Sequence, residues 1–289
     1  MDSTNFEFND SLLDVVPSEP TGYVDDGQDT SENFAGLEAS REFPANLWID
    51  PDDWKDAARE NDKYGTWAET TRQNIGRFTN QQPTHECTCH SLVQGAEAAY
   101  RVQSGFKYNI ALSPISVYAE ANPRQWGGAN CLNVLRIAME RGFLPEPVHG
   151  QSEIFEHTLH GTCGQGNENN SRGDWVPLSQ FPDGWKRTAG ELKPIEAINP
   201  RTIEQCVCLI LAGYVVNVGR NGHAVPWNHL VWRGRAMYFG YADSYDIVRY
   251  DSWRTARGAV GGASSITLMS TPATFENAFY DGTNDINTT

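Results

Sequence analysis

Residues 80–92, which lead into a helical pattern, read Asn80-Gln81-Gln82-Pro83-Thr84-His85-Glu86-Cys87-Thr88-Cys89-His90-Ser91-Leu92. Apolar residues recur at helical spacing between Thr88 and Val102, which predicts a helix that begins at Cys87. Backbone N–H groups without helical partners and the positive end of the helix dipole favour a thiolate there. Gln81, six residues upstream, carries a side-chain N–H that can stabilise an oxyanion beside the sulfur. Cys87 is therefore a candidate nucleophile; the alternative is a structural cysteine beside a turn.

This segment resembles the active-site segment of papain-like cysteine peptidases, in which a glutamine precedes the catalytic cysteine by six residues and that cysteine starts the central helix. The resemblance covers about residues 75–270. It implies an α+β, two-lobed fold, with a helical lobe that begins with the cysteine helix and packs on a β-rich, barrel-like lobe. The implied peptidase domain spans residues 46–275. The positions of the family's usual disulfide hold Thr84 and Gln125, and no secretory signal is visible, so we expect reduced cysteines.

Two segments after the cysteine helix extend the resemblance. Leu112-Ser113-Pro114 resembles the family's "LSP" segment and predicts a helix with Ser113 as its cap. Gly127 and Gly128 come before a second helical pattern that ends at Gly142. Paired glycines let another backbone approach closely. In the family this pair binds the substrate peptide as an added strand, so the resemblance implies that Gly127 and Gly128 bind substrate.

The second half of the chain is expected to be β-rich and to supply a histidine. Cys206–Val218 is interpreted as a buried strand, and Gly213–Gly219 resembles the strand that precedes the family's catalytic histidine. Two histidines follow it. We favour His229, because the alternating pattern continues beyond it and because it lies 142 residues after Cys87, within the interval of papain-type enzymes. His223 stays open as the alternative, although Pro226 is expected to interrupt its strand.

A third element of the site is expected 22 residues after His229. Asp251-Ser252-Trp253 resembles the family's "NSW" motif, with Asp251 in place of asparagine. The resemblance implies that Asp251 orients the imidazole of His229 and that Trp253 shields their hydrogen bond and contributes to substrate binding. The implied chemistry needs no metal and no organic cofactor. His149, His157, His160 and Cys163 match no familiar zinc spacing.

The distribution of charge along the chain indicates which kinds of partner the protein can bind. The net charge is −15, and residues 1–63 hold seventeen acidic against four basic residues, which leaves about −2 for the rest. The acidic charge therefore belongs to an N-terminal arm, residues 1–45, that is too polar to fold alone. The arm is a candidate for docking on a protein partner or a larger assembly. We expect no nucleic-acid binding, because no basic stripe is present. No apolar run approaches membrane-spanning length. A helix is predicted from Asp52 to about Trp67, and residues 276–289 form a tail.

Three functions follow from these observations. The first is a cysteine peptidase that acts on polypeptides, in the cytoplasm or in a virion. The second is a structural subunit of an assembly such as a phage particle, which has kept a papain-like body; the altered Asp251 motif motivates it. The third is a peptidoglycan amidase of the related Cys–His type, which usually lacks the preceding glutamine and the glycine pair.

Overall fold

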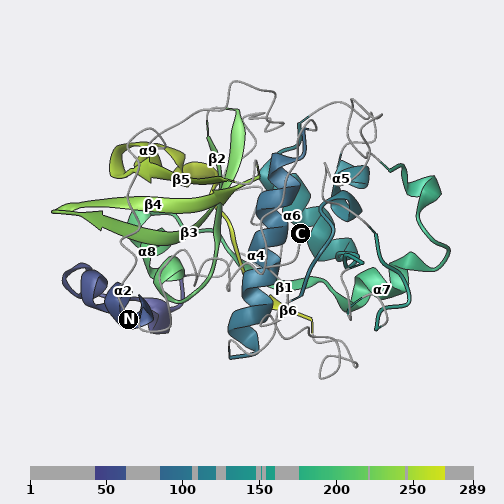
Figure 1. The fold of residues 1–289 in the computed structure, drawn as a ribbon, viewed down its shortest axis with the longest axis horizontal. Helices are drawn as coiled ribbons and strands as arrows, with labels where there is room; N and C mark the ends of the chain where they lie inside the picture. The colour runs from purple at the N-terminus through teal and green to yellow at the C-terminus, as the bar shows by residue number, and fades with distance from the viewer. Residues whose placement is uncertain are drawn as a thin grey trace.

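Two lobes make up the fold in the computed structural model, which describes residues 43–62, 85–105, 110–121, 128–147, 151, 154–159, 176–220, 222–244 and 247–270. Helices form one lobe and an antiparallel sheet with its covering helices forms the other, and the long helix α4 (Cys87–Gln103) lies between them (Figure 1). The expected α+β, two-lobed arrangement is confirmed. The helix predicted to begin at Cys87 is confirmed as well.

The helical lobe packs around the buried face of α4. It contains α5 (Ile115–Ala121), α6 (Cys131–Arg141), the 3-10 turn η4 (Leu178–Gln180) and α7 (Trp185–Glu191). Helix α6 begins as its sequence requires, because the Asn130 side chain accepts hydrogen bonds from the N–H groups of Leu132 and Asn133. It ends at Gly142, whose φ of 83° allows the turn. The core of this lobe includes Leu92, Tyr100, Leu135 and Phe143.

The β lobe is a four-stranded antiparallel sheet in the order β2-β3-β4-β5. Its strands are β2 (Val216–Arg220), β3 (His223–Arg233), β4 (Ala236–Asp243) and β5 (Ile247–Ser252). Around it lie the 3-10 turns η2 (Ala45–Leu47) and η3 (Pro51–Asp53), and helices α2 (Trp54–Asp62), α8 (Ile203–Leu211) and α9 (Trp253–Ala259). Among the described strands the sheet is open, so the barrel-like description is too strong.

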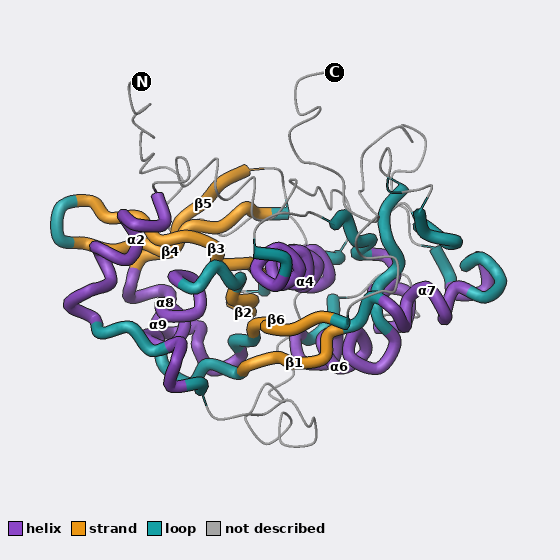
Figure 2. Tube along the Cα trace, turned by 90° about the horizontal axis from the view of Figure 1, so that it is seen from below, coloured by secondary structure: helices purple, strands orange, loops and turns teal. Residues whose placement is uncertain are grey.

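A two-stranded antiparallel sheet runs beneath both lobes. Its strands are β1 (Pro194–Ile198) and β6 (Ser265–Met269), and the 3-10 turn η5 (Val260–Gly262) precedes β6. Figure 2 looks along α4 and shows these strands below it, between the β lobe and α6 and α7. The chain thus returns to the helical lobe at its end: Ile266 and Met269 of β6 are part of the helical lobe's core.

The interpretation of Cys206–Val218 as a strand is wrong in its first half. Residues Ile203–Leu211 form helix α8, and only the part from Val216 is a strand. Thr202 caps the helix by accepting from the N–H of Gln205, and Gly213, with a φ of 91°, turns the chain into β2. The apolar run was ambiguous because a helix buried on all sides shows little periodicity.

Pro226 does not interrupt its strand, contrary to the expectation. It pairs with Asn217 of β2 inside a continuous β3. Asn217 directs its own N–H and C=O to Ser264, at 2.7 and 2.9 Å, so the pair with Pro226 needs no N–H from the proline. The pairing of β3 with β4 begins only at Trp227. Proline is tolerated at such a position because no ladder hydrogen bond is lost.

Several predictions from the sequence lie outside the described residues, among them the arm up to residue 42, the continuation of the Asp52–Trp67 helix beyond Asp62, and the tail. In the part of the chain that is described, no helix is both long and apolar enough to cross a membrane.

Candidate active site

Helix α4 is fixed to the sheet by polar side chains one and two turns after Cys87. Ser91 Oγ donates to Asn217 Oδ1 at 2.9 Å, and Gln94 Nε2 donates to the carbonyl of Ala242 at 3.1 Å. Gly95 makes the close approach possible, because a Cβ there would lie 2.8 Å from Asn217 Nδ2. All these groups are buried, so the hydrogen bonds fix the position of the helix start against β2, β3 and β4.

Cys87 lies against the first residues of β3. Its Sγ accepts a hydrogen bond from the backbone N–H of Ala224 at 3.3 Å, and Cys87, Ala224 and Cys131 form one buried cluster. The residue before Ala224 is His223, and the side chain of Cys87 is close enough to its imidazole to raise the pKa of His223. Cys87 and His223 are 0% and 1% exposed. The structure therefore pairs the helix-start thiol with the histidine that the sequence analysis kept as the alternative.

Asp243, the last residue of β4, holds the other side of the imidazole. His223 Nε2 lies 2.8 Å from Asp243 Oδ1, and the carboxylate is fully buried. The second carboxylate oxygen, Oδ2, lies 2.8 Å from Arg249 Nε on β5. Because Asp243 occupies Nε2, the nitrogen that faces the thiol is Nδ1. Cys87, His223, Asp243 and Arg249 thus follow one another from the helix across three strands.

The environment of His223 favours its protonated form. Burial lowers the pKa of His223, while the hydrogen bond to Asp243, the neighbouring Cys87 side chain and the charges of both groups raise it, to a net value of about 9. The imidazole is thus positively charged at neutral pH. A neighbouring cysteine differs: burial, followed by the charge of Glu86, raises the pKa of Cys89 well above its usual range, so Cys89 is a protonated core thiol.

The assignment of His229 to the site is not supported by its position. Its ring lies over Gly240, where a Cβ would be 2.1 Å from His229 Nε2, and next to Tyr250. Its Nδ1 lies 2.6 Å from Asn228 Oδ1. Burial lowers the pKa of His229 to about 3, so the ring stays neutral. It has no charged form with which to stabilise a thiolate near neutral pH.

A β-bulge explains why the two histidines point to opposite faces of the sheet. Six residues separate them, so a regular strand would place both on one face. However, Trp227 pairs with Tyr241 while His229 pairs with Gly240, so β3 has one extra residue at Asn228. Every side chain beyond the bulge changes face. Leu230 accordingly joins Trp227 in the core of the β lobe, and His229 turns away from it.

Asp251 and Trp253 also have other partners. Asp251 Oδ2 accepts from Trp227 Nε1 at 2.8 Å, and Oδ1 pairs with Arg220 Nη2 at 2.8 Å. This carboxylate is on the face of the sheet opposite to the ring of His229, so it does not orient that ring. Trp253 packs against Trp54 and Phe239, with ring centroids 6.3 and 6.0 Å apart. The Asp251-Ser252-Trp253 motif is therefore a structural feature at the start of α9.

Ala129, the residue after Gly128, lies beside the start of α4. Thr88 Oγ1 donates to the carbonyl of Ala129 at 3.0 Å, which brings the residue after Gly128 next to Cys87. Cys131, at the start of α6, packs on Cys87 itself. Gln81 and Gly127 lie outside the described residues, so their roles remain predictions.

Two signals in the sequence are compatible with the pair of His223 and Asp243. Asp243-Ser244-Tyr245 is an Asp-Ser-aromatic triplet that lies eight residues before Asp251-Ser252-Trp253. In addition, His223 lies 136 residues after Cys87, so the papain-type interval accommodates both histidines. Arg249 carried no signal, because its relation to Asp243 depends on the pairing of β4 with β5.

Within the described ranges, no three His, Cys, Asp or Glu side chains are grouped so that they could hold a metal ion. His157 interacts with Thr188 Oγ1 at 3.1 Å, while His149, His160 and Cys163 lie outside those ranges.

Comparisons with known proteins give structural likeness only. No family model and no curated protein sequence matches the chain. A digestive procathepsin L 3 from the larval midgut of Tenebrio molitor is 10% identical, with 68% of this chain and 67% of that chain covered and a TM-score of 0.49. Xylellain, a cysteine protease from Xylella fastidiosa, is 11% identical, with coverages of 89% and 98% and a TM-score of 0.47. The bromelain protease from Ananas comosus, in complex with the E64 inhibitor, is 13% identical, with coverages of 71% and 97% and a TM-score of 0.45. At these values, the function has to be argued from the chain's own side chains.

Proposed function

We propose that the chain is a cysteine peptidase in which Cys87 is the nucleophile, His223 the general base and acid, and Asp243 the residue that orients His223. The observation that supports this most strongly is the order of contacts: thiol, imidazole and carboxylate follow one another, with the thiol at the start of a 17-residue helix. This is the arrangement that nucleophilic catalysis by a thiol requires.

In the resting enzyme the proton of the Cys87 thiol is already on His223, so that a thiolate and an imidazolium face each other before the substrate binds. The helix start and the N–H of Ala224 both stabilise the negative sulfur. In the first half of the reaction, the thiolate attacks the carbonyl carbon of a peptide bond, and the carbonyl oxygen becomes an oxyanion. The backbone N–H of Cys87 and the side chain of Gln81 are the proposed donors to that oxygen. His223 then gives its proton to the leaving amine, the C–N bond breaks, and an acyl thioester remains on Cys87.

In the second half, neutral His223 accepts a proton from a water molecule that attacks the thioester. The C–S bond breaks, the carboxylic acid product leaves, and the proton returns to the Cys87–His223 pair. Asp243 keeps the ring oriented throughout by accepting from Nε2–H. Arg249 balances the charge of that carboxylate, so the imidazole faces a partly neutralised partner.

The substrate that fits this chemistry is a polypeptide. The segment of Gly128 and Ala129 beside Cys87 is suited to hold an extended peptide through main-chain hydrogen bonds. A nucleic-acid substrate is not proposed, because the chain carries a net charge of −15 and the sequence shows no basic stripe that could bind phosphates.

One observation favours a second candidate, a structural protein with a papain-like body. Because Cys87 and His223 are almost completely buried, a substrate carbonyl reaches the sulfur only if the covering chain moves. Catalysis requires this opening, whereas a structural role does not. The rate at which Cys87 reacts with a small alkylating reagent therefore separates the two candidates.

The test uses the full chain and Cys87→Ala, with Cys206→Ala as the matched control, since Cys206 is an equally buried thiol on α8. Hydrolysis of a denatured protein and of peptidoglycan is measured in parallel, together with iodoacetamide labelling mapped by mass spectrometry. A peptidase loses protein hydrolysis in Cys87→Ala only, and label is found on Cys87. Peptidoglycan cleavage without protein cleavage would instead indicate the amidase, and an unlabelled Cys87 would indicate the structural protein.

A further inference from the structure

A pocket lies at the end of the β lobe remote from Cys87 and His223. Its lining residues come from α2, from the hairpin between β3 and β4, and from the junction of β5 and α9: Trp54, Trp232, Arg235, Ala236, Met237, Tyr238, Ser252, Trp253 and Arg254. Its volume is about 470 Å³, within the range of ligand and peptide sites. His223 and Trp232 are nine residues apart on β3, which corresponds to about 30 Å along a strand. The pocket is thus separate from the candidate active site.

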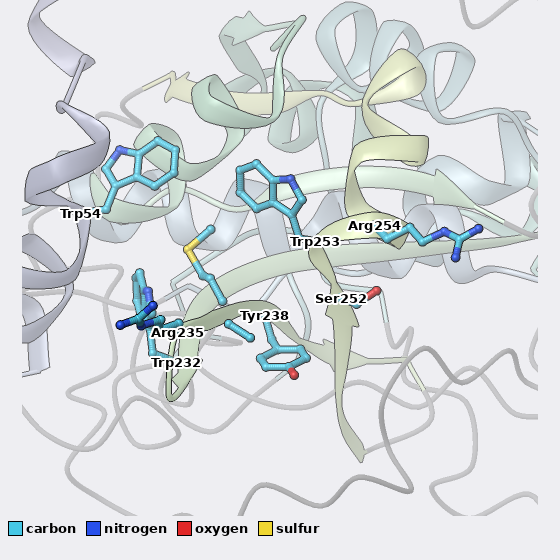
Figure 3. A pocket seen from close by; sticks show the side chains of 9 residues that line it. Trp54, Trp232, Arg235, Tyr238, Ser252, Trp253 and Arg254 are labelled. Atoms are coloured by element: carbon cyan, nitrogen blue, oxygen red, sulfur yellow. The ribbon is translucent and has the colours of Figure 1, made fainter.

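The lining combines aromatic side chains with the guanidinium groups of Arg235 and Arg254. Figure 3 shows Trp54 next to Trp253, Arg235 beside Trp232, and Arg254 beyond Trp253. Both arginines are exposed, and neither has an ion-pair partner within the described part of the chain. Tryptophan, tyrosine and arginine are the residues that contribute most at protein recognition sites. A ligand that matches this lining offers carboxylates together with aromatic or aliphatic side chains.

The chain itself contains such a segment. Residues 1–42 hold eleven acidic residues and a single basic one, hence a charge of −10, and they include Phe6, Phe8 and Tyr23. The pattern Phe6-Glu7-Phe8-Asn9-Asp10 alternates aromatic with polar or acidic side chains. Charge and apolar character both complement the pocket.

The attachment point of this segment is on the same lobe as the pocket. Residue 42 is followed by Phe43, which packs on the same core cluster as Trp54, Trp232 and Trp253. Because the arm is tethered there, its effective concentration at the pocket is on the order of millimolar, and even weak contacts suffice for occupancy. Forty-two residues span far more than the distance required.

We propose that residues 1–42 dock in this pocket, with aromatic side chains against Trp54 and Trp253 and carboxylates at Arg235 and Arg254. The arm then attaches to the β lobe of its own chain, away from the cysteine. This site is independent of the peptidase activity. The arm of a second copy, or an acidic peptide of another protein, would satisfy the same chemistry but would show a different outcome in the test.

The test is site-specific photo-crosslinking in the full chain. A benzoylphenylalanine replaces Ala236, an exposed residue of the pocket, and in the control it replaces Glu140, an exposed residue of α6 in the helical lobe. Cross-linked peptides are identified by mass spectrometry in a mixture of isotopically light and heavy protein. We expect residues 1–42 to be cross-linked from position 236 at least about fivefold more than from position 140, within single chains, and less at high salt.

A charge-reversed variant tests the cations. Arg235→Glu with Arg254→Glu is expected to reduce the cross-link about fivefold, while Arg136→Glu with Arg187→Glu, both exposed arginines of the helical lobe, leaves it unchanged. Circular dichroism verifies that both variants are folded. Equal cross-linking from positions 236 and 140, cross-links to other segments only, or light–heavy cross-links between two copies would each overturn the proposal.

Discussion

His223 Nε2 and Asp243 Oδ1 meet at 2.8 Å, and both side chains are almost completely buried. His223 is the first residue of β3 and Asp243 is the last residue of β4, and because these neighbouring strands are antiparallel, the two residues lie at the same end of the sheet. The contact therefore exists only once the sheet is formed, and it fixes the imidazole in the direction of Cys87. In an uncharged core this carboxylate would be costly; beside a protonated imidazole and Arg249 it is compensated.

Asp243→Asn tests the role of this carboxylate. The amide oxygen still accepts from Nε2–H, so the ring keeps its orientation, but the negative charge that favours imidazolium is lost. We expect kcat/KM for a peptide substrate to fall about tenfold and its alkaline limb to move to lower pH. Asp243→Ala also loses the orientation and should fall about 10²- to 10³-fold. Wild-type kinetics in Asp243→Ala would contradict the assignment.

The two histidines give a second prediction. His223→Asn removes the base and is expected to lower hydrolysis at least about 10³-fold and to abolish fast alkylation of Cys87 at pH 7. His229→Gln leaves the Cys87–His223 contact in place, so activity per folded molecule should stay within about threefold of the wild type. If His229→Gln were the inactive variant and His223→Asn the active one, the assignment would be reversed.

The elements that local sequence determines could be predicted. The helix from Cys87 has apolar residues at helical spacing, and α6 has both its Asn130 cap and Gly142 at its end. Each of these signals acts within a few residues. They located Cys87, the proposed nucleophile, and the segment of Gly128 and Ala129 beside it, because both lie at helix starts.

The choice of histidine could not be made in this way. It depends on one extra residue at Asn228, which has no sequence signature and reverses the direction of every later side chain in β3. The expected interruption of the strand at Pro226 was wrong for a similar reason. The strand accommodates this proline because Asn217 forms its backbone hydrogen bonds with Ser264 and not with β3. Asp251-Ser252-Trp253 resembles the family's motif in sequence, but Asp251 lies on the face of the sheet opposite to the ring of His229. Its carboxylate accepts a hydrogen bond from Trp227 and forms an ion pair with Arg220. Long-range pairing decided all three.

Arg249→Gln tests whether the arginine tunes the pair. The guanidinium places a positive charge beside the Asp243 carboxylate, which disfavours imidazolium at His223. Removal of that charge should raise the pKa of His223 further above about 9, and the alkaline limb of kcat/KM should move up by about half a unit or more. Arg249→Lys keeps the charge and should keep the limb. An NMR titration of the imidazole resonances of His223 measures the same pKa without a substrate. The same pKa of His223 in Arg249→Gln and in Arg249→Lys would contradict the prediction.

Acid sensitivity should come partly from His229. Its pKa is about 3 in the folded chain and about 6.5 when exposed, so between these values the unfolded chain binds a proton that the folded chain does not. Stability is therefore lost as pH falls from 6.5 towards 3. Between pH 7 and 4.5 the free energy of unfolding should decrease by about 2–3 kcal/mol more in the wild type than in His229→Gln. Urea unfolding at both pH values measures it; equal decreases would show that His229 is protonated without cost.

Gly240 should be required for stability, because the buried ring of His229 occupies the space that a side chain at residue 240 would need. A Cβ at residue 240 would lie 2.1 Å from His229 Nε2, so Gly240→Ala forces the ring out of its place. We expect a loss of about 2–4 kcal/mol in the free energy of unfolding. In a His229→Ala background the same change should cost less than about 1 kcal/mol, since the clashing ring is absent. Gly258→Ala on α9, where a Cβ meets nothing within 4 Å, serves as the control and should stabilise by about 0.5–1 kcal/mol. Equal costs of Gly240→Ala in both backgrounds would mean that the glycine is required for its backbone and not for the space it leaves to His229.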